Sequence, residues 1–423
     1  MNEIDEIVVT GGRPLHGTVR IQGSKNTALP VMAAALLSSG TSVLRECPKI
    51  TDVFLMEKIL RELGAETWWE DHDLYLDCSH ADGTVIPEYF SGKMRSSVIL
   101  LGAMLGRNGK ARTGYPGGCV IGKRPVDLHI QVLQKLGARI VENGNEIQAT
   151  CGKLKGAEVI FPKSSVGATE QGILAAVLAE GKTVFTGCAR EPEITWLCQY
   201  LTGMGAKIEI LENGSICIEG VKKLHPGSGT IPPDRIVAGT YLMAGAATRG
   251  EIILENPPID EMHAILEVYR KMGGQCHRIG GKLIVNGKNA GFPLELLETD
   301  VYPGFPTDLQ SPAMAVLVTI PGVSRIREKI FEDRYKLASW LCHMGAKIVI
   351  RDGMAVVHGG YPLRGCIVEA EELRGGAALV IAALAAEGVT RIRGCSFIER
   401  GYEHICEDLT ALGGLLIKDR GTL

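Results

Sequence analysis

The repeating feature of the chain is an amphipathic segment that ends in glycine. Apolar residues recur at helical spacing, as in Val53, Met56 and Leu60, and Leu63 is followed by Gly64. This spacing predicts an amphipathic helix, and glycine readily adopts the left-handed conformation that closes one. Similar closing tripeptides recur about every 70 residues, at 63–65, 136–138, 204–206, 272–274, 344–346 and 412–414. We therefore predict six copies of one structural unit.

Each predicted unit also contains a segment that is apolar on every side, which indicates a helix buried all round. These segments span 28–37, 98–105, 173–179, 241–247, 313–320 and 377–386. Two short strands follow the amphipathic helix, as at 207–211 and 215–219 about a turn at Asn213-Gly214. Three buried helices could form the centre of a domain, with the sheets outside them. Six units would then give two α/β domains of three units each.

The charge and cysteine content narrow the possible partners. The 423 residues carry a net charge of −3, and Lys and Arg are dispersed along the chain, so nothing favours nucleic acid or an anionic membrane surface. The longest apolar run, 377–386, is too short to span a bilayer. Twelve cysteines without paired spacing and an acidic N-terminus predict a cytoplasmic protein. We expect small-molecule partners and no metal or cofactor, whereas the sequence leaves the oligomeric state open.

The sequence becomes polar where each buried helix should begin. These starts are Ser24-Lys25-Asn26, Lys93-Met94-Arg95, 163–167, Pro233-Asp234-Arg235, Pro306-Thr307-Asp308 and Glu372-Leu373-Arg374. Helix capping alone would explain the residue types of Ser24, Ser165, Thr307 and Asp308. It does not explain the recurring Lys and Arg, which are disfavoured at a helix N-terminus unless an anion is present. The pattern therefore predicts an anionic, phosphorylated substrate.

A glycine-rich stretch presents one cysteine. Gly114, Pro116 and 117–118 precede Cys119, which predicts a loop. Pro125 suits the first turn of a following helix, so Lys123 and Arg124 should lie at its start. Neighbouring cations would make the Cys119 thiol more reactive. The alternative is a small buried apolar residue, which is the interpretation we give to Cys47, Cys78 and Cys188, and His129 on the flank of the same helix is a weak candidate.

Several motifs resemble those of the enolpyruvyl transferases over the whole chain, most closely the branch that acts on UDP-N-acetylglucosamine. The motifs are 21–26, Pro116-Gly117-Gly118-Cys119, 122–129, 165–169, 190–194, Pro233-Asp234-Arg235-Ile236, 303–308 and Arg400-Gly401-Tyr402-Glu403. The resemblance implies an inside-out α/β barrel pair of six βαβαββ-type repeats. It further implies one discontinuous domain of 1–23 plus 232–423, an inserted domain of 24–231, and an active site in the cleft between them.

The resemblance also implies a reaction and roles for named residues. Phosphoenolpyruvate and UDP-N-acetylglucosamine would give the 3-O-enolpyruvyl ether and phosphate, the first committed step of peptidoglycan synthesis. Cys119 would protonate the methylene carbon, and Asp308 would accept the proton of the 3-hydroxyl. Lys25, Arg124 and Arg400 would bind phosphoenolpyruvate, with Lys25 and Arg400 counted as catalytic and Arg334 and Arg374 nearby in role. The sugar nucleotide would contact Asn26, Arg95, Arg124, Pro125, Val126, Asp127, Leu128, Lys163, Ser164, Ser165, Val166, Asp308 and Ile330.

Departures from the family pattern lie late in the chain and keep alternatives open. Glu372-Leu373-Arg374 stands where Asp-Leu-Arg is usual, and Val237 replaces a frequent glutamate. The usual Glu-Asn-Arg-Phe-x-His becomes 332–337, with Asp333, Tyr335 and Leu337 at the changed positions. One alternative is therefore a paralogue that binds the UDP-sugar with little or no catalysis. Another is a 5-enolpyruvylshikimate-3-phosphate synthase, which lacks the Gly-Gly-Cys loop.

Overall fold

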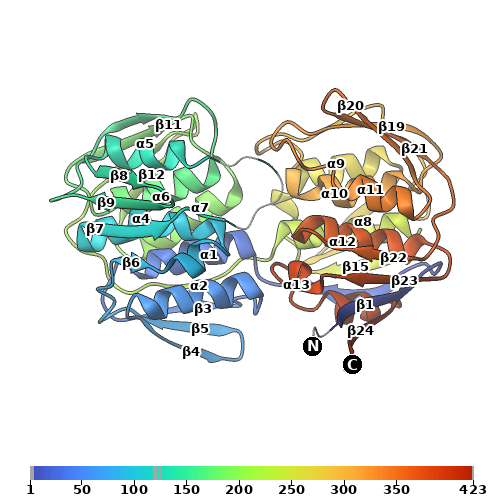
Figure 1. Ribbon diagram of the computed structural model, residues 1–423, viewed down its shortest axis with the longest axis horizontal. Coiled ribbons are helices and arrows are strands. Elements are labelled where there is room, and N and C mark those ends of the chain that lie inside the picture. The colour runs from blue at the N-terminus through green and yellow to red at the C-terminus, as the bar shows by residue number, and fades with distance from the viewer. Residues whose placement is uncertain (1–3, 118–121, 123–124, 422–423) are drawn as a thin grey trace. The chain divides into compact units, whose positions relative to one another are not determined.

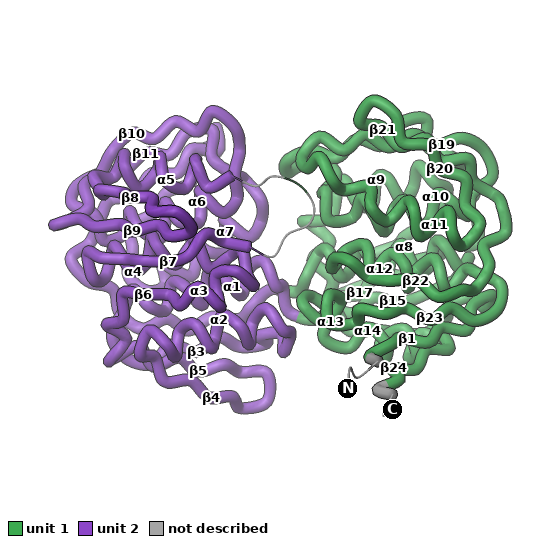
Figure 2. Tube along the Cα trace, viewed as in Figure 1, with its two compact units in different colours: residues 1–22, 120–123, 233–423 green, residues 23–119, 124–232 purple. Residues whose placement is uncertain are grey.

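The structure is a computed structural model that describes residues 4–117, 122 and 125–421, and its chain falls into two compact units (Figures 1 and 2). The terminal unit comprises residues 1–22 and 233–423 together with the short segment 120–123, and the middle unit comprises 23–119 and 124–232. The chain thus passes between the units after Gln22 and after Pro232. Each unit has its own hydrophobic core.

Within the described residues, the terminal unit contains three four-stranded sheets of the same topology. Each sheet has one parallel and two antiparallel strand pairs. The strand orders are β22 (Ile367–Glu369), β23 (Val389–Arg393), β1 (Ile4–Thr10) and β24 (Leu415–Gly421); β16 (Gln275–Ile279), β17 (Lys282–Asn286), β15 (Glu251–Glu255) and β2 (His16–Arg20); and β18 (Leu297–Glu298), β19 (Gly322–Arg327), β21 (Met354–Gly359) and β20 (Lys347–Arg351).

The described part of the middle unit repeats this arrangement. Its sheets are β14 (Ser228–Thr230), β3 (Thr41–Arg45), β5 (Asp73–Asp77) and β4 (Glu66–Glu70); β6 (Val85–Ile86), β7 (Lys110–Gly114), β9 (Glu146–Thr150) and β8 (Arg139–Asn143); and β10 (Glu158–Ile160), β11 (Lys182–Thr186), β13 (Ile216–Glu219) and β12 (Lys207–Ile210). The two predicted strands at 207–211 and 215–219 are each one residue shorter in the structure.

Three buried helices form the centre of each unit, as the apolar segments predict. In the terminal unit these are α8 (Arg235–Ala247), α12 (Leu373–Ala385) and α10 (Gln310–Leu317), which continues the 3₁₀ helix η3 (Thr307–Leu309). In the middle unit they are α1 (Lys25–Ala35), α6 (Val166–Ala176) and α4 (Leu100–Asn108), which continues η1 (Arg95–Ile99). All residues of α8 are buried, as expected for a helix without a polar face.

Amphipathic helices complete each unit outside these centres. They are α9 (His263–Lys271), α11 (Leu337–His343) and α14 (Ile405–Ala411) in the terminal unit, and α2 (Thr51–Glu62), α5 (Asp127–Lys135) and α7 (Pro192–Gly203) in the middle unit. Short helices α3 (Glu88–Ser91), α13 (Cys395–Ile398) and η2 (Ile259–Glu261) lie in the connections. The predicted architecture of two inside-out α/β barrels built from six repeats is confirmed.

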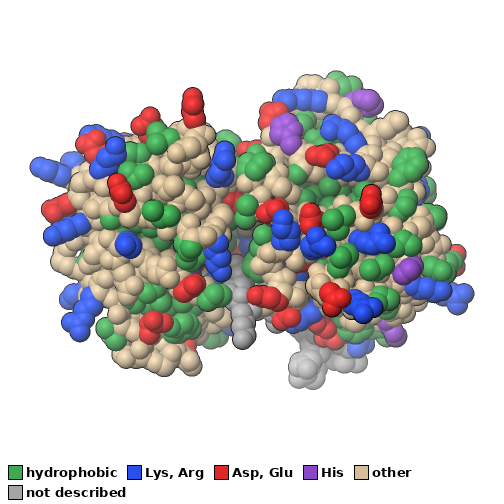
Figure 3. Space-filling view, turned by 90° about the horizontal axis from the view of Figure 1, so that it is seen from above, with side chains coloured by type: hydrophobic (Ala, Val, Ile, Leu, Met, Phe, Trp, Pro, Cys, Tyr) green, Lys and Arg blue, Asp and Glu red, His purple; other side chains and the backbone are tan. Residues whose placement is uncertain are grey.

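Close approach of the central helices depends on glycine at specific positions. A Cβ atom on Gly102 of α4 would lie 2.3 Å from the carbonyl oxygen of Gln171 in α6. Backbone atoms cannot move aside as a flexible side chain can, so only glycine fits there. On the face shown in Figure 3, Lys and Arg side chains alternate with Asp and Glu, as the dispersed charges of the sequence suggest.

Candidate active site

Asp308 is the centre of a charged cluster at the start of the central helices of the terminal unit. It lies in η3, and its Oδ1 accepts a hydrogen bond of 3.0 Å from Nη2 of Arg334. Its Oδ2 accepts hydrogen bonds from Nε and Nη2 of Arg374 in α12, at 3.1 and 2.9 Å. Both arginine side chains are almost completely buried, whereas that of Asp308 is 29% exposed. The carboxylate is therefore held by two charges and remains accessible to a substrate.

Glu372 caps the N-terminus of the neighbouring helix α12. Its side chain caps α12 by accepting the N–H groups of Arg374 and Gly375, the former at 2.8 Å. Its Oε2 also lies 3.6 Å from Nη1 of Arg334. The longer carboxylate thus reaches both the helix N-terminus and one of the arginines that hold Asp308.

Tyr402 lies under the second arginine. The guanidinium carbon of Arg374 is 5.5 Å from the centroid of the Tyr402 ring, and the Tyr402 hydroxyl is 2.8 Å from Oγ1 of Thr240 in α8. Burial alone would lower the pKa of Arg374, but Asp308, Tyr402 and Asp234 together outweigh burial and raise that pKa, so Arg374 stays charged. Burial also raises the pKa of Tyr402. Nη1 of Arg374 is buried and makes no hydrogen bond with the described residues.

The third helix start of this unit contributes Asp234 and Arg235. Asp234 caps α8 through hydrogen bonds of 2.7 and 3.1 Å to the N–H groups of Ile236 and Val237. Arg235 is buried and lies 5.8 Å from the centroid of the Tyr302 ring. Asp234 also acts electrostatically on Arg374 and Tyr402. The starts of α8, η3 and α12 therefore come together.

Arg400 and Ile330 lie on loops of the same unit. Arg400 is half-buried in the turn that follows α13. The next residues of this turn are held by Gln22, whose amide donates to the carbonyl of Gly401 at 3.2 Å and accepts from the N–H of Glu403 at 2.8 Å. Ile330 is half-buried, and its N–H donates to Glu328 at 2.8 Å.

In the middle unit, Lys25 is the first residue of α1 and pairs with an aspartate that lies in none of the polar helix starts named above. Its Nζ lies 2.7 Å from Oδ2 of Asp52 in the first turn of α2. Ser24 caps α1 by accepting the N–H of Thr27, and Asn26 is half-buried beside it. The sequence gives little indication of a role for Asp52, which is simply an acidic residue in the first turn of an amphipathic helix.

Arg95 and the residues before α5 lie close together in the same unit. Nη2 of Arg95, in η1, donates to the carbonyl of Pro125 at 3.0 Å. The helix predicted from Pro125 begins two residues later, at Asp127, because the backbone of Val126 is not yet helical. Val126 and Leu128 are buried, whereas Pro125 and Asp127 are exposed. Cys119, Lys123 and Arg124 lie outside the described residues.

The remaining candidate residues lie at the start of α6. Lys163 is exposed, Ser164 is half-buried, and Ser165 caps the helix that begins with Val166. His129 of α5 is buried and hydrogen-bonds to Gln171 of α6, so it is a core residue. Cys47, Cys78 and Cys188 are buried, as predicted.

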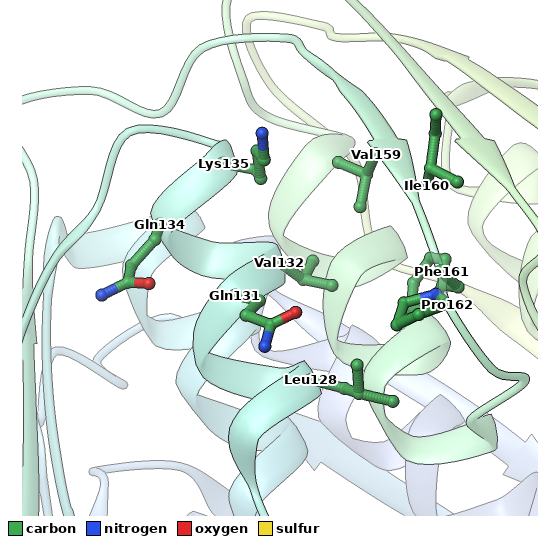
Figure 4. Close-up of a pocket in the computed structure, with 9 residues that line it drawn as sticks. All are labelled: Leu128, Gln131, Val132, Gln134, Lys135, Val159, Ile160, Phe161 and Pro162. Atoms are coloured by element: carbon green, nitrogen blue, oxygen red, sulfur yellow. The ribbon is translucent and has the colours of Figure 1, made fainter.

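A pocket of about 450 Å³ lies beside these residues, between α5 and the segment that leaves β10 (Figure 4). Leu128, Val132 and Phe161 form apolar walls, and the amide of Gln131 lies between the two segments. Pro162, which precedes Lys163, also lines it. Among the described residues no group of three His, Cys, Asp or Glu side chains could hold a metal ion, and no helix is long and apolar enough to cross a membrane.

Comparison with known proteins agrees with this geometry. The fold matches solved enolpyruvyl transferases: the enzyme NikO from Streptomyces tendae aligns over 100% of both chains with a TM-score of 0.90 at 23% identity. The EPSP synthase of Acinetobacter baumannii aligns over 98% of this chain and 100% of its own, with a TM-score of 0.75 at 19% identity. Residues 9–409 match the family model for EPSP synthase (3-phosphoshikimate 1-carboxyvinyltransferase), and the chain belongs to this family.

Curated relatives share considerably more sequence. A protein of Carboxydothermus hydrogenoformans is 42% identical over 412 residues, which are 97% of this chain and 98% of the relative. One of Caldanaerobacter subterraneus is 40% identical over 410 residues, with the same coverage. Both are named UDP-N-acetylglucosamine 1-carboxyvinyltransferase 2. The predicted relationship to the enolpyruvyl transferases is confirmed.

Proposed function

We propose that this protein transfers the enolpyruvyl group of phosphoenolpyruvate to the 3-hydroxyl of UDP-N-acetylglucosamine and releases phosphate. The observation that carries the proposal is the 40–42% identity to two enzymes named for this activity, over 97% of this chain. Such a protein would act in the cytoplasm, at the first committed step of peptidoglycan synthesis. The EPSP synthase alternative is less favoured, because the solved EPSP synthases that match are only 18–19% identical.

Asp308 is proposed to accept the proton of the attacking 3-hydroxyl. Each carboxylate oxygen has two lone pairs, so Asp308 can hold Arg334 and Arg374 and still accept a further hydrogen bond. The hydroxyl oxygen then bonds to the second carbon of phosphoenolpyruvate, while the methylene carbon takes a proton. Cys119 is proposed to supply that proton. The tetrahedral intermediate then loses phosphate from the second carbon and a proton from the new methyl group, which restores the double bond. General acid and base catalysis each contribute roughly 10²–10⁴ in rate.

The remaining rate enhancement requires stabilisation of negative charge. Phosphoenolpyruvate carries a phosphate and a carboxylate, and arginine binds both groups well because its donors match their geometry. The unpartnered Nη1 of Arg374 supports a role in anion binding, as does the position of Lys25 at the first turn of α1. Arg124, Arg334 and Arg400 are proposed to share this role.

The sugar nucleotide is proposed to bind the middle unit along the start of α5 and the start of α6, at 124–128 and 163–166. Asn26 and Arg95 would extend this surface, and Asp308 and Ile330 would contact the sugar nucleotide from the terminal unit. The pocket at Leu128 and Pro162 offers apolar walls of a kind that favours a nucleobase. This proposal concerns a small-molecule substrate, and no metal is required for the chemistry described.

The experiment that tests the function is phosphate release from phosphoenolpyruvate, with and without UDP-N-acetylglucosamine, in the wild type and in Cys119→Ser and Asp308→Asn. Release that depends on the nucleotide and is lost in both variants would support the proposal. Shikimate 3-phosphate in place of the UDP-sugar tests the EPSP synthase alternative. Binding of the UDP-sugar without phosphate release would favour the non-catalytic paralogue, and inactivation by fosfomycin would independently place a reactive Cys119 in the site.

A further inference from the structure

The carboxylate of Glu328 joins two segments of the terminal unit. Glu328 follows β19, and its Oε1 accepts the N–H groups of Ile330 and Phe331 at 2.8 and 3.2 Å. Its Oε2 accepts the hydroxyl of Thr307 at 3.0 Å. One side chain therefore fixes the turn that carries Ile330 and connects it to the residue that precedes Asp308.

The turn is also fixed on its other side. The hydroxyl of Tyr335, which is buried, accepts the backbone N–H of Glu328 at 2.8 Å and lies 2.9 Å from the carbonyl of Ile326 and 3.1 Å from that of Gly353. The N–H of Lys329 donates to Oγ1 of Thr299 at 3.0 Å. Since both the backbone and the side chain of Glu328 are engaged, its carboxylate has little freedom to move.

Thr307 connects Glu328 to the charged cluster around Asp308. Its carbonyl accepts weak hydrogen bonds from Nε and Nη2 of Arg334, at 3.4 and 3.3 Å. The same Nη2 donates to Asp308 at 3.0 Å. Glu328 is thus separated from the proposed catalytic base by one hydrogen bond and one peptide bond, and from Ile330 by a single hydrogen bond.

We propose that Glu328 is a positioning residue that sets the spacing between Asp308 and the nucleotide-contacting turn at Ile330, an inference that rests on the proposed function. The UDP-sugar must present its 3-hydroxyl to Asp308 while another part of the molecule contacts Ile330. A fixed spacing between these two residues therefore favours the reactive alignment. Thr307 and Tyr335 hold Glu328 in place through their hydrogen bonds to it, and Arg334 in turn bonds to the carbonyl of Thr307.

The test compares Glu328→Ala and Glu328→Gln with the control Glu298→Ala. Glutamine keeps an oxygen that can accept the two N–H groups, whereas alanine removes every acceptor. Glu298 forms an exposed ion pair of 2.9 Å with Arg327, the residue that precedes Glu328. Exposed ion pairs contribute little to stability, so Glu298→Ala removes a nearby carboxylate without a large effect of its own. The measurements are the affinity for UDP-N-acetylglucosamine by calorimetry, kcat and KM for phosphate release, the hydrogen exchange of the Ile330 and Phe331 amides, and the thermal midpoint of unfolding.

We expect Glu328→Ala to lower kcat/KM for the UDP-sugar roughly ten- to hundredfold, since small displacements of reacting groups have effects of this size. KM for phosphoenolpyruvate should stay close to that of the wild type, the two amides should exchange faster, and the thermal midpoint should confirm that the variant is folded. Glu328→Gln should recover most of the loss, and Glu298→Ala should match the wild type.

The proposal is wrong if folded Glu328→Ala retains nucleotide affinity and kcat within about twofold of the wild type. It is equally wrong if Glu328→Gln is as impaired as Glu328→Ala, because the hydrogen-bond acceptors would then not explain the effect. A wild type that binds the UDP-sugar but releases no phosphate overturns the proposed function alone, and the affinities and exchange rates still decide the role of Glu328. A wild type that binds no UDP-sugar overturns both.

Discussion

The pairing of Asp308 with Arg374 allows a quantitative test of the charged cluster. We consider Asp308→Asn, Arg374→Met and the double variant. Asp308 accepts three charged hydrogen bonds of 2.9 to 3.1 Å, two of them from Arg374. Hydrogen bonds of this kind contribute about 1.5–3 kcal/mol each, and asparagine keeps one accepting oxygen. The loss is reduced because the Asp308 side chain is 29% exposed and partly solvated, so we expect Asp308→Asn to cost about 2–3 kcal/mol.

A double-mutant cycle separates the pair from the rest of the cluster. Asp308→Asn leaves two buried arginines with Glu372 as a nearby carboxylate, 3.6 Å from Arg334, and removing the Arg374 charge relieves that imbalance. The double variant should therefore be more stable than the sum of the single variants predicts, with a coupling energy of about 1.5–2 kcal/mol. Urea unfolding of the four proteins measures this energy. A buried pair is screened only weakly, so the coupling should persist at high salt.

The result that would refute this reasoning is a coupling energy below about 0.5 kcal/mol, which is the usual additivity error for independent sites. Asp308 and Arg374 would then not be paired in solution. Phosphate release gives a separate readout, because Asp308→Asn should lower kcat by roughly 10²–10⁴ if Asp308 is the base. Arg374→Met should also raise KM for phosphoenolpyruvate, since Arg374 is proposed to bind an anion.

Three further predictions concern stability. Burial raises the pKa of Asp408 from 3.8 to about 6, so the folded state keeps a proton that the unfolded state releases in this interval; stability should fall as the pH rises through it, and Asp408→Asn should flatten that part of an unfolding profile. Tyr335→Phe leaves the N–H of Glu328 without its acceptor and should cost about 1–3 kcal/mol in urea unfolding, whereas the exposed Tyr361→Phe should change little. Gly102→Ala should lower the thermal midpoint because its Cβ would meet a backbone oxygen at 2.3 Å, whereas Gly203→Ala in α7 meets nothing and should raise stability by about 0.4–1 kcal/mol. An unchanged profile in Asp408→Asn, equal effects of the two tyrosine changes, or equal effects of the two glycine changes would each contradict the corresponding argument.

Most of the fold could be predicted from the periodicity of the sequence. The glycine after each amphipathic helix and the absence of a polar face on the central helices reflect local backbone and solvation preferences, which are visible in one sequence. Gly64, Gly137 and Gly205 all have positive φ, as predicted for helix ends. The start of α5 was less well predicted, because proline at 125 permits a helix but does not require one to begin there.

The site was predictable only where it coincides with a helix start. Asp308 and Arg374 occupy such positions, so their residue types pointed to chemistry before their contacts were known. Asp52 and Glu328 did not stand out, because an aspartate in a first helical turn and a glutamate after a strand are common on protein surfaces. Their partners, Lys25 and Thr307, are brought to them by the tertiary fold at sequence separations that no local pattern indicates.

The late departures from the family pattern bear on whether the chain is a catalyst or only binds the UDP-sugar. Glu372 still caps α12 and still lies within 4 Å of Arg334, so the extra methylene has not separated it from the cluster. The Tyr335 hydroxyl adds an acceptor for the turn at Glu328. These changes affect groups that support Arg334 and Arg374, whereas the two arginines keep their hydrogen bonds to Asp308. A protein that had lost catalysis would have no need to keep two buried arginines on one carboxylate, which costs desolvation energy. The arrangement therefore favours an active transferase.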